Sequence, residues 1–179
     1  SMTMRIAFVA KDRCDLAVAA KELSRHMQSP TSANWDQHKR VGRYLVGRRR
    51  AAMRFEPQER PRYVDAVVDT DHAGCLTTRR STTGLCVDCG VHTIKTRSNM
   101  QSVITINARE SEYGGIVTGA AVGLSTQSLL RDWQIETKVR GSSDSAAARS
   151  FSSRRGLGKQ RHVQTKCLWV QERVAEKHM

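Results

Sequence analysis

The sequence contains no apolar run of about 18 residues, the length that a helix needs to span a membrane. Residues 1–10 also lack the long apolar core and the small-residue cleavage site of a secretory signal. No internal repeat is present. We therefore expect an intracellular protein, cytoplasmic or nuclear and not secreted, with no membrane among its partners.

Cysteine is sparse and irregularly spaced. The chain has five cysteines, an odd number, which is typical of a reduced intracellular protein. Cys86 and Cys89 form a lone Cys-x-x-Cys pair, and one pair cannot supply the four ligands of a structural zinc site. We expect these two cysteines, and His92 near them, to be ordinary residues of a half-buried strand.

Acidic residues are too few to balance the basic ones. Lys and Arg number 30 against 17 Asp and Glu, which gives a formal net charge of +13 over 179 residues. Such an excess favours nucleic acid as a partner, because each neutralised phosphate releases condensed counterions. A basic surface that serves only solubility is the alternative.

Two helical patterns occupy the first fifty residues. Apolar residues recur at helical spacing from Leu16 to Met27, and Pro30 ends that pattern. A second helix is expected over 33–46, and the arginine run 48–50 after it marks a boundary. The predicted domains are a helical segment over 1–52 and a second domain over 53–179.

The second domain changes to the two-residue period of strands. Short polar connections join its first three strands, which predicts antiparallel neighbours. A long helix, a fourth strand and two further helices follow, so we expect an α/β fold with a mixed sheet flanked by helices. The expected strands cover 63–69, 84–94, 102–106 and 138–143, and the expected helices cover 113–133, begin at 144, and cover 163–174.

Three carboxylates stand where these elements begin or end. Asp69 ends the first strand, Glu112 lies in the first turns of the long helix, and Asp144 joins the fourth strand to its helix. Clustered carboxylates repel one another and become useful when they share divalent ions. Two ions about 4 Å apart can activate a water and stabilise the leaving oxygen in phosphodiester cleavage. Hard oxygen ligands suit Mg²⁺ or Mn²⁺.

Each of these residues also has an ordinary structural explanation. Asp69 could close a turn, Glu112 could be a charge favoured by the helix macrodipole, and Asp144 could be a helix N-cap. Their shared topology is what favours a common site.

Six motifs, in one consistent order, resemble the RNase H region of copia-type retrotransposon polyproteins. VDTDHAG resembles DADWAG, RRSTTG resembles RKSTSG, TINARESEY resembles ALSSTEAEY, and SDSAA resembles CDNQSA. KQRHV stands where the family has RTKHI, and 15–47 resembles the segment after the polymerase palm. In this chain these motifs occupy 68–74, 79–84, 105–113, 143–147, 159–163 and 15–47.

The resemblance implies an RNase H fold and metal-dependent cleavage of the RNA strand of RNA–DNA hybrids. By position, Asp69, Glu112 and Asp144 match the family's first three acids, with Asp71 and Glu110 as alternates. Residues 1–52 would then be a remnant of the reverse transcriptase thumb or connection.

The chain also departs from the family. His72 replaces a tryptophan, and the family's fourth acid follows a fifth strand that this sequence does not reach. The resemblance therefore implies an incomplete two-metal site, unless Glu172 or Glu176 substitutes. It also implies an exposed sheet edge that invites self-association. The alternative function is a catalytically weak or inactive nucleic-acid-binding fragment with the same fold.

Small polar residues and cations are the expected contacts to a hybrid. Hydroxyls can bind phosphate or the RNA 2′-hydroxyl, and cations bind phosphate. The candidates are Arg79, Arg80, Ser81, Thr82, Thr83, Lys95, Arg97, Arg161 and His162.

Overall fold

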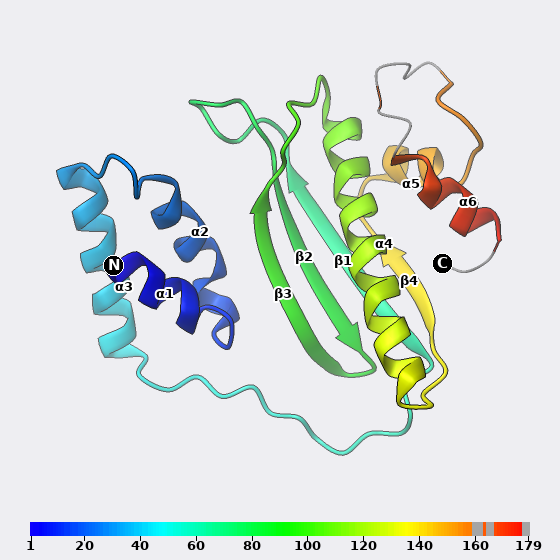
Figure 1. Ribbon diagram of the computed structural model, residues 1–179, viewed down its shortest axis with the longest axis horizontal. Helices are drawn as coiled ribbons and strands as arrows, with labels where there is room; N and C mark the ends of the chain where they lie inside the picture. The colour runs from blue at the N-terminus through cyan, green and yellow to red at the C-terminus, as the bar shows by residue number, and fades with distance from the viewer. Residues whose placement is uncertain (159–162, 164–166, 177–179) are drawn as a thin grey trace. The chain divides into compact units, whose positions relative to one another are not determined.

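The computed structural model describes residues 1–158, 163 and 167–176. The chain divides into two compact units, Ser1–Glu56 and Pro57–Met179, and each is described by itself. Figure 1 shows the elements of both units. The first unit contains α1 (Met2–Val9), a 3-10 turn η1 (Cys14–Leu16), α2 (Ala17–Arg25) and α3 (Ser32–Gly47).

Helix α3 of the first unit begins after Thr31, one of the two capping residues that the sequence suggests. The side chain of Thr31 accepts a hydrogen bond from the amide of Asn34, and the side chain of Asn34 bonds back to Thr31. Arg13 pairs with Asp15 at 2.7 Å and donates to the carbonyl of Arg48 at 3.1 Å. Both predicted helices are confirmed, whereas α1 was not predicted. That the unit is a polymerase remnant stays a prediction.

The second unit is built on a four-stranded mixed sheet. Its strands are β1 (Tyr63–Asp71), β2 (Thr82–Cys89), β3 (His92–Met100) and β4 (Lys138–Ser142), in the order β3-β2-β1-β4. The first three are antiparallel neighbours, and β4 runs parallel to β1. The expected fold class is confirmed. Self-association along an edge strand stays a prediction.

The third strand is not where the sequence pattern placed it. One strand was predicted over 84–94 and the next over 102–106, but the chain turns at Gly90 and returns as β3. Gly90 has a φ of +64°, which a tight hairpin turn requires and which glycine adopts at low cost. The apolar residues Ile104 and Ile106, which suggested a strand, are exposed in the loop before α4.

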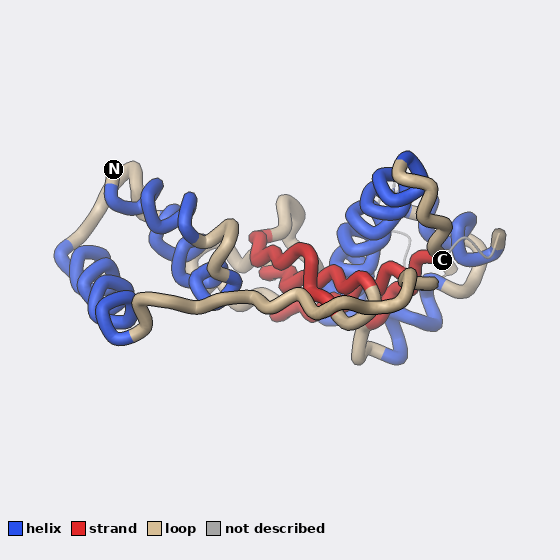
Figure 2. Tube along the Cα trace, turned by 90° about the horizontal axis from the view of Figure 1, so that it is seen from below, coloured by secondary structure: helices blue, strands red, loops and turns tan. Residues whose placement is uncertain are grey.

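Three helices complete the described part of the second unit. They are α4 (Ala108–Asp132), α5 (Ala146–Ser152) and α6 (Trp169–Ala175). Figure 2 shows α4 lying on one side of the layer of strands. The β1 residues Val64, Ala66 and Val68 face this side and are at most 4% exposed, as their alternation predicts. No helix in the described part of the chain combines the length and apolarity that crossing a membrane requires.

A ridge of glycines lets α4 approach the sheet closely. The ridge residues are spaced four apart, so they share one face of the helix. A Cβ atom added at any of them would lie between 2.6 and 2.8 Å from a side-chain atom of β1 or β4, closer than real Cβ atoms approach. Glu112 lies three residues before the ridge and therefore shares its face. The ridge consists of Gly115, Gly119 and Gly123.

We expect Gly119→Ala to destabilise the second unit. The new Cβ would lie 2.7 Å from Cγ1 of Val68. Overpacking of about 1–3 kcal/mol exceeds the gain of about 1 kcal/mol in helix propensity, so the net effect is a lower free energy of unfolding. Urea denaturation measures this difference.

Gly42→Ala on α3 is the matched control, because nothing lies within 4 Å of the added Cβ. It should stabilise its own helix by up to about 1 kcal/mol. Equal stabilisation by Gly119→Ala would contradict close packing of α4.

Candidate metal centre

Three elements of the second unit deliver one carboxylate each to the same place. Asp69 lies near the end of β1, Glu112 in the second turn of α4, and Asp144 two residues after β4. Because β1 and β4 are parallel, their carboxyl ends lie at the same edge of the sheet. One carboxylate oxygen from each of the three residues lies within 4.8 Å of the others. The sequence prediction that they share one site agrees with this geometry.

The three carboxylates differ in their access to solvent. Asp69 and Asp144 are exposed, whereas Glu112 is 9% exposed beneath them. Burial raises the pKa of Glu112 above its ordinary value, and the charges of Asp144 and Asp69 raise it further. Hydrogen bonds from Ser143 and from the backbone of Thr70 oppose this shift. The charged form of Glu112 is therefore disfavoured at this position.

The turn after β4 holds Asp144 in place. Ser145, and not Asp144, is the N-cap of α5, and its hydroxyl accepts from the amide of Ala148 at 3.2 Å. Arg149 donates to the backbone carbonyl of Ser143. The capping explanation for Asp144 was therefore wrong, and its side chain is left available to the cluster.

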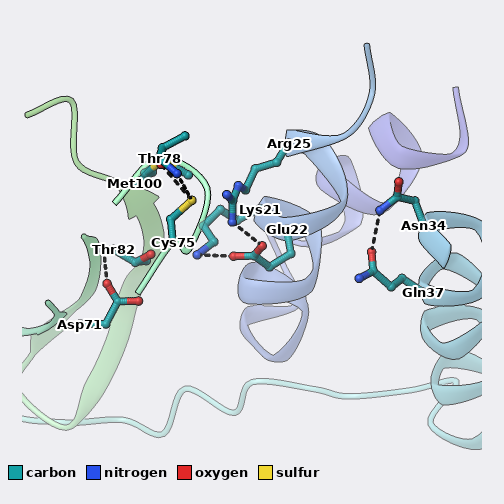
Figure 3. Close-up of polar contacts among 10 residues, drawn as sticks. All are labelled: Lys21, Glu22, Arg25, Asn34, Gln37, Asp71, Cys75, Thr78, Thr82 and Met100. Carbon is teal, nitrogen blue, oxygen red and sulfur yellow. Dashed lines mark hydrogen bonds and ion pairs between the residues drawn. The ribbon is translucent and has the colours of Figure 1, made fainter. Parts of the chain in front are cut away.

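The alternates Asp71 and Glu110 have other roles. Figure 3 shows the carboxylate of Asp71 bonded to Thr82, whose backbone amide it accepts from across the β1–β2 hairpin. Glu110, in the first turn of α4, accepts from the amide of Ile106 at 2.8 Å, two residues before the helix begins. Both carboxylates are engaged in closing turns, which favours Asp69 and Glu112 as the ligands.

Among the described residues, no fourth carboxylate joins the cluster. Glu172 and Glu176, considered as substitutes, are exposed on and just after α6 and line a separate cavity with Arg155 and Gly156. The described site therefore offers three carboxylate ligands.

Two of the hydroxyls predicted to bind nucleic acid are buried. Ser81 is 0% exposed, and its hydroxyl accepts from the amide of Ala73 and lies 3.3 Å from that of Thr105. Thr83 is 4% exposed and accepts from the side chain of Gln101 at 2.9 Å. We therefore correct the prediction that these two hydroxyls contact phosphate directly. Ser81 connects the loops that contain Ala73 and Thr105, and Thr83 connects β2 to Gln101.

The predicted cations remain accessible. Arg79 and Arg80 are exposed in the loop between β1 and β2, beside the partly exposed Thr82. Lys95 and Arg97 are exposed on β3. They pair with Val87 and Leu85 of β2, so their side chains lie on the face of the sheet that α4 covers. The remaining predicted residues, Arg161 and His162, lie outside the described residues.

Two polar residues that support Glu112 were not predicted. Gln101 donates to the hydroxyl of Thr83 at 2.9 Å and to the carbonyl of Ser111 at 2.8 Å, which ties the first turn of α4 to β2. Ser143 donates to Glu112 Oε2 at 3.3 Å. A polar residue beside a site carries no periodic signal, so the sequence pattern did not single them out.

The cysteine pair behaves as predicted. Cys89 is 7% exposed in the core, and Cys86 belongs to the opposite face of β2, where it donates to Asp88. Residues three apart on a strand point to opposite faces, so these two sulfurs do not converge on one ion.

The donor set fits a divalent ion. Three carboxylates, one of them buried with a raised pKa, supply hard oxygen ligands and an unbalanced negative charge. The fold and site thus define a class: an α/β protein with a mixed sheet and a carboxylate cluster able to hold a metal ion.

Comparison with known proteins gives the family. An uncharacterized mitochondrial protein of Arabidopsis thaliana is 32% identical over 133 residues, which are 74% of this chain and 55% of that protein. The retrovirus-related Pol polyprotein from transposon RE2 of the same plant is 32% identical over 131 residues, or 73% of this chain and 9% of the polyprotein. The secreted RxLR effector protein 161 of Plasmopara viticola is 32% identical over 101 residues, or 56% of this chain and 70% of the effector.

The chain is thus similar to a part of a retrotransposon Pol polyprotein. It spans about half the length of the mitochondrial relative and less than a tenth of the transposon polyprotein, at 55% and 9%. No protein-family model and no solved structure matches it.

The raised pKa of Glu112 predicts a pH-dependent stability in the absence of divalent ions. The folded protein binds the proton of the Glu112 carboxyl group more tightly than the unfolded chain does, in which the pKa of this group is near the ordinary 4.5. The free energy of unfolding therefore falls as the pH rises from 4.5 through the raised pKa, and stays low above it. Glu112→Gln should remove this fall and be more stable than wild type at neutral pH.

Thermal unfolding in EDTA across this pH range measures the effect. Glu136→Gln, which removes an exposed carboxylate beyond the far end of α4, is the control and should follow the wild-type curve. A Glu112→Gln curve parallel to wild type would show that Glu112 is not strained.

Proposed function

We propose that this chain is a retroelement ribonuclease H that cleaves the RNA strand of RNA–DNA hybrids with divalent metal ions. The observation that carries the proposal is the convergence of Asp69, Glu112 and Asp144 from three elements of a mixed sheet. Similarity to the retrovirus-related Pol polyprotein of a transposon supports it. We place the activity inside the cell, because an odd number of irregularly spaced cysteines favours a reducing compartment.

The chain's own residues have distinct parts in this proposal. Mg²⁺ or Mn²⁺, when bound, supplies charge stabilisation and an activated water for phosphodiester hydrolysis. The exposed Asp69 and Asp144 would hold the ions where a hybrid can reach them, and the buried Glu112 would be the third ligand. The burial of Glu112 strengthens its attraction to a cation.

Exposed cations on the same unit provide the contacts to the nucleic acid backbone. Arg79 and Arg80 lie in the loop after β1, the strand that carries Asp69. Lys95 and Arg97 add charge along β3. Such contacts bind phosphate without reading sequence, which suits a nuclease that acts on hybrids of any sequence.

A binding module with little or no activity is the second candidate. Two observations favour it: the described cluster offers three carboxylates, and the net charge of the chain is +13. Loss of a metal ligand removes chemistry but leaves phosphate contacts intact. This candidate predicts hybrid binding that weakens steeply with salt, without cleavage.

We expect Asp144→Asn to abolish cleavage of a labelled RNA–DNA hybrid in Mg²⁺ or Mn²⁺. Loss of one ligand that stabilises developing charge lowers the rate at least about 100-fold. Because Asp144 is exposed and does not cap α5, the exchange should leave the thermal unfolding temperature near that of wild type. Gel analysis of cleavage and thermal unfolding are measured together.

Asp132→Asn is the matched control. It makes the same chemical change at an exposed site on α4, 20 residues beyond Glu112 and about 30 Å along the helix. It should retain full activity. Undiminished cleavage by Asp144→Asn would sink the ribonuclease proposal, and absent cleavage by wild type with salt-sensitive binding would favour the binding module.

A further inference from the structure

One buried hydroxyl joins two of the three segments that carry the carboxylates. Ser143 follows β4 directly and precedes Asp144, and it is 8% exposed. Its hydroxyl lies 3.3 Å from Oε2 of Glu112, on α4. The residue therefore contacts one carboxylate through its side chain and adjoins another through its backbone.

The surroundings of Ser143 orient its single hydroxyl proton. A serine hydroxyl donates once and accepts through two lone pairs. Its oxygen accepts from the amide of Ser145 at 3.2 Å, and an ionised Glu112 can only accept. The proton is thereby directed at the carboxylate.

The backbone of Ser143 is fixed as well. Its carbonyl accepts from Nη1 of Arg149 on α5. Because this carbonyl belongs to the peptide group that joins Ser143 to Asp144, the contact limits the freedom of the Asp144 backbone. Both ends of the Glu112–Ser143–Asp144 connection are thus held before any ion binds.

We propose that Ser143 is a positioning residue of the metal centre, which holds the Glu112 carboxylate in a fixed orientation relative to Asp144. The inference rests on the proposed metal-dependent function of the site. One hydrogen-bonded oxygen stops the carboxylate from rotating about its terminal bond, so its ligand oxygen keeps its direction. Hydrogen-bonding partners of metal ligands typically contribute 10- to 100-fold to metal affinity.

The test is Mn²⁺ binding to the whole chain, followed by electron paramagnetic resonance without nucleic acid. Ser143→Ala should weaken Mn²⁺ affinity roughly ten- to hundredfold. Ser143→Thr, which retains the hydroxyl, should recover most of the affinity. Should Ser143→Ala not fold, Ser143→Cys gives the same comparison, because its thiol is a weaker donor of similar shape.

Ser145→Ala separates positioning from simple support of the turn. It removes a hydroxyl two residues away that caps α5 and does not contact Glu112. It should lower thermal stability and leave Mn²⁺ affinity unchanged. An equal loss of affinity in Ser145→Ala and Ser143→Ala would overturn the positioning role.

The outcomes also distinguish the two proposals. Wild-type Mn²⁺ binding that Asp144→Asn abolishes, together with undiminished affinity in Ser143→Ala, overturns the role of Ser143 and leaves the metal centre standing. No Mn²⁺ binding by wild type overturns both proposals.

Discussion

The close approach of α4 to the sheet is the constraint on which the site depends. Glycine at 115, 119 and 123 removes the Cβ atoms that would otherwise meet side chains of β1 and β4 at under 3.0 Å. The same helix face carries Glu112, so the packing that seals the core also carries a carboxylate to the end of β1. A helix held further away would leave Glu112 in solvent and separate it from Asp69. The packing of α4 on the sheet therefore also determines the geometry of the site.

That packing has an electrostatic cost. A carboxylate buried beside two others is disfavoured in its charged form, which is why the pKa of Glu112 is raised. Proteins commonly accept such local strain where a ligand relieves it. A divalent cation would relieve it here, since it adds positive charge among three acidic oxygens. The hydrogen bond from Ser143 offers partial relief without an ion and preserves the arrangement that the ion needs.

The sequence predicted those parts of the fold that follow a regular period. Alternation identified β1, helical spacing identified α4, and the placement of Asp69, Glu112 and Asp144 on those elements predicted their convergence. The β3 strand was misplaced because none of its residues is buried, so it has no apolar period. The exposed Ile104 and Ile106 have the two-residue spacing of a strand, but they lie in a loop.

Burial of polar residues was the part that the sequence did not predict. Ser81 and Thr83 have the chemistry of phosphate contacts, and only the tertiary structure shows that their hydroxyls face inward. Gln101 and Ser143 were missed for the converse reason. Their importance comes from hydrogen bonds to residues that are distant in the sequence, and no local sequence pattern indicates such contacts.

The most direct test of the central claim is the anomalous diffraction of crystals of this protein soaked in Mn²⁺. The account predicts an anomalous peak bounded by the carboxylate oxygens of Asp69, Glu112 and Asp144, at a metal–oxygen distance of about 2.0–2.4 Å. Crystals that bind Mn²⁺ at other acidic groups, with no peak among these three, would contradict it.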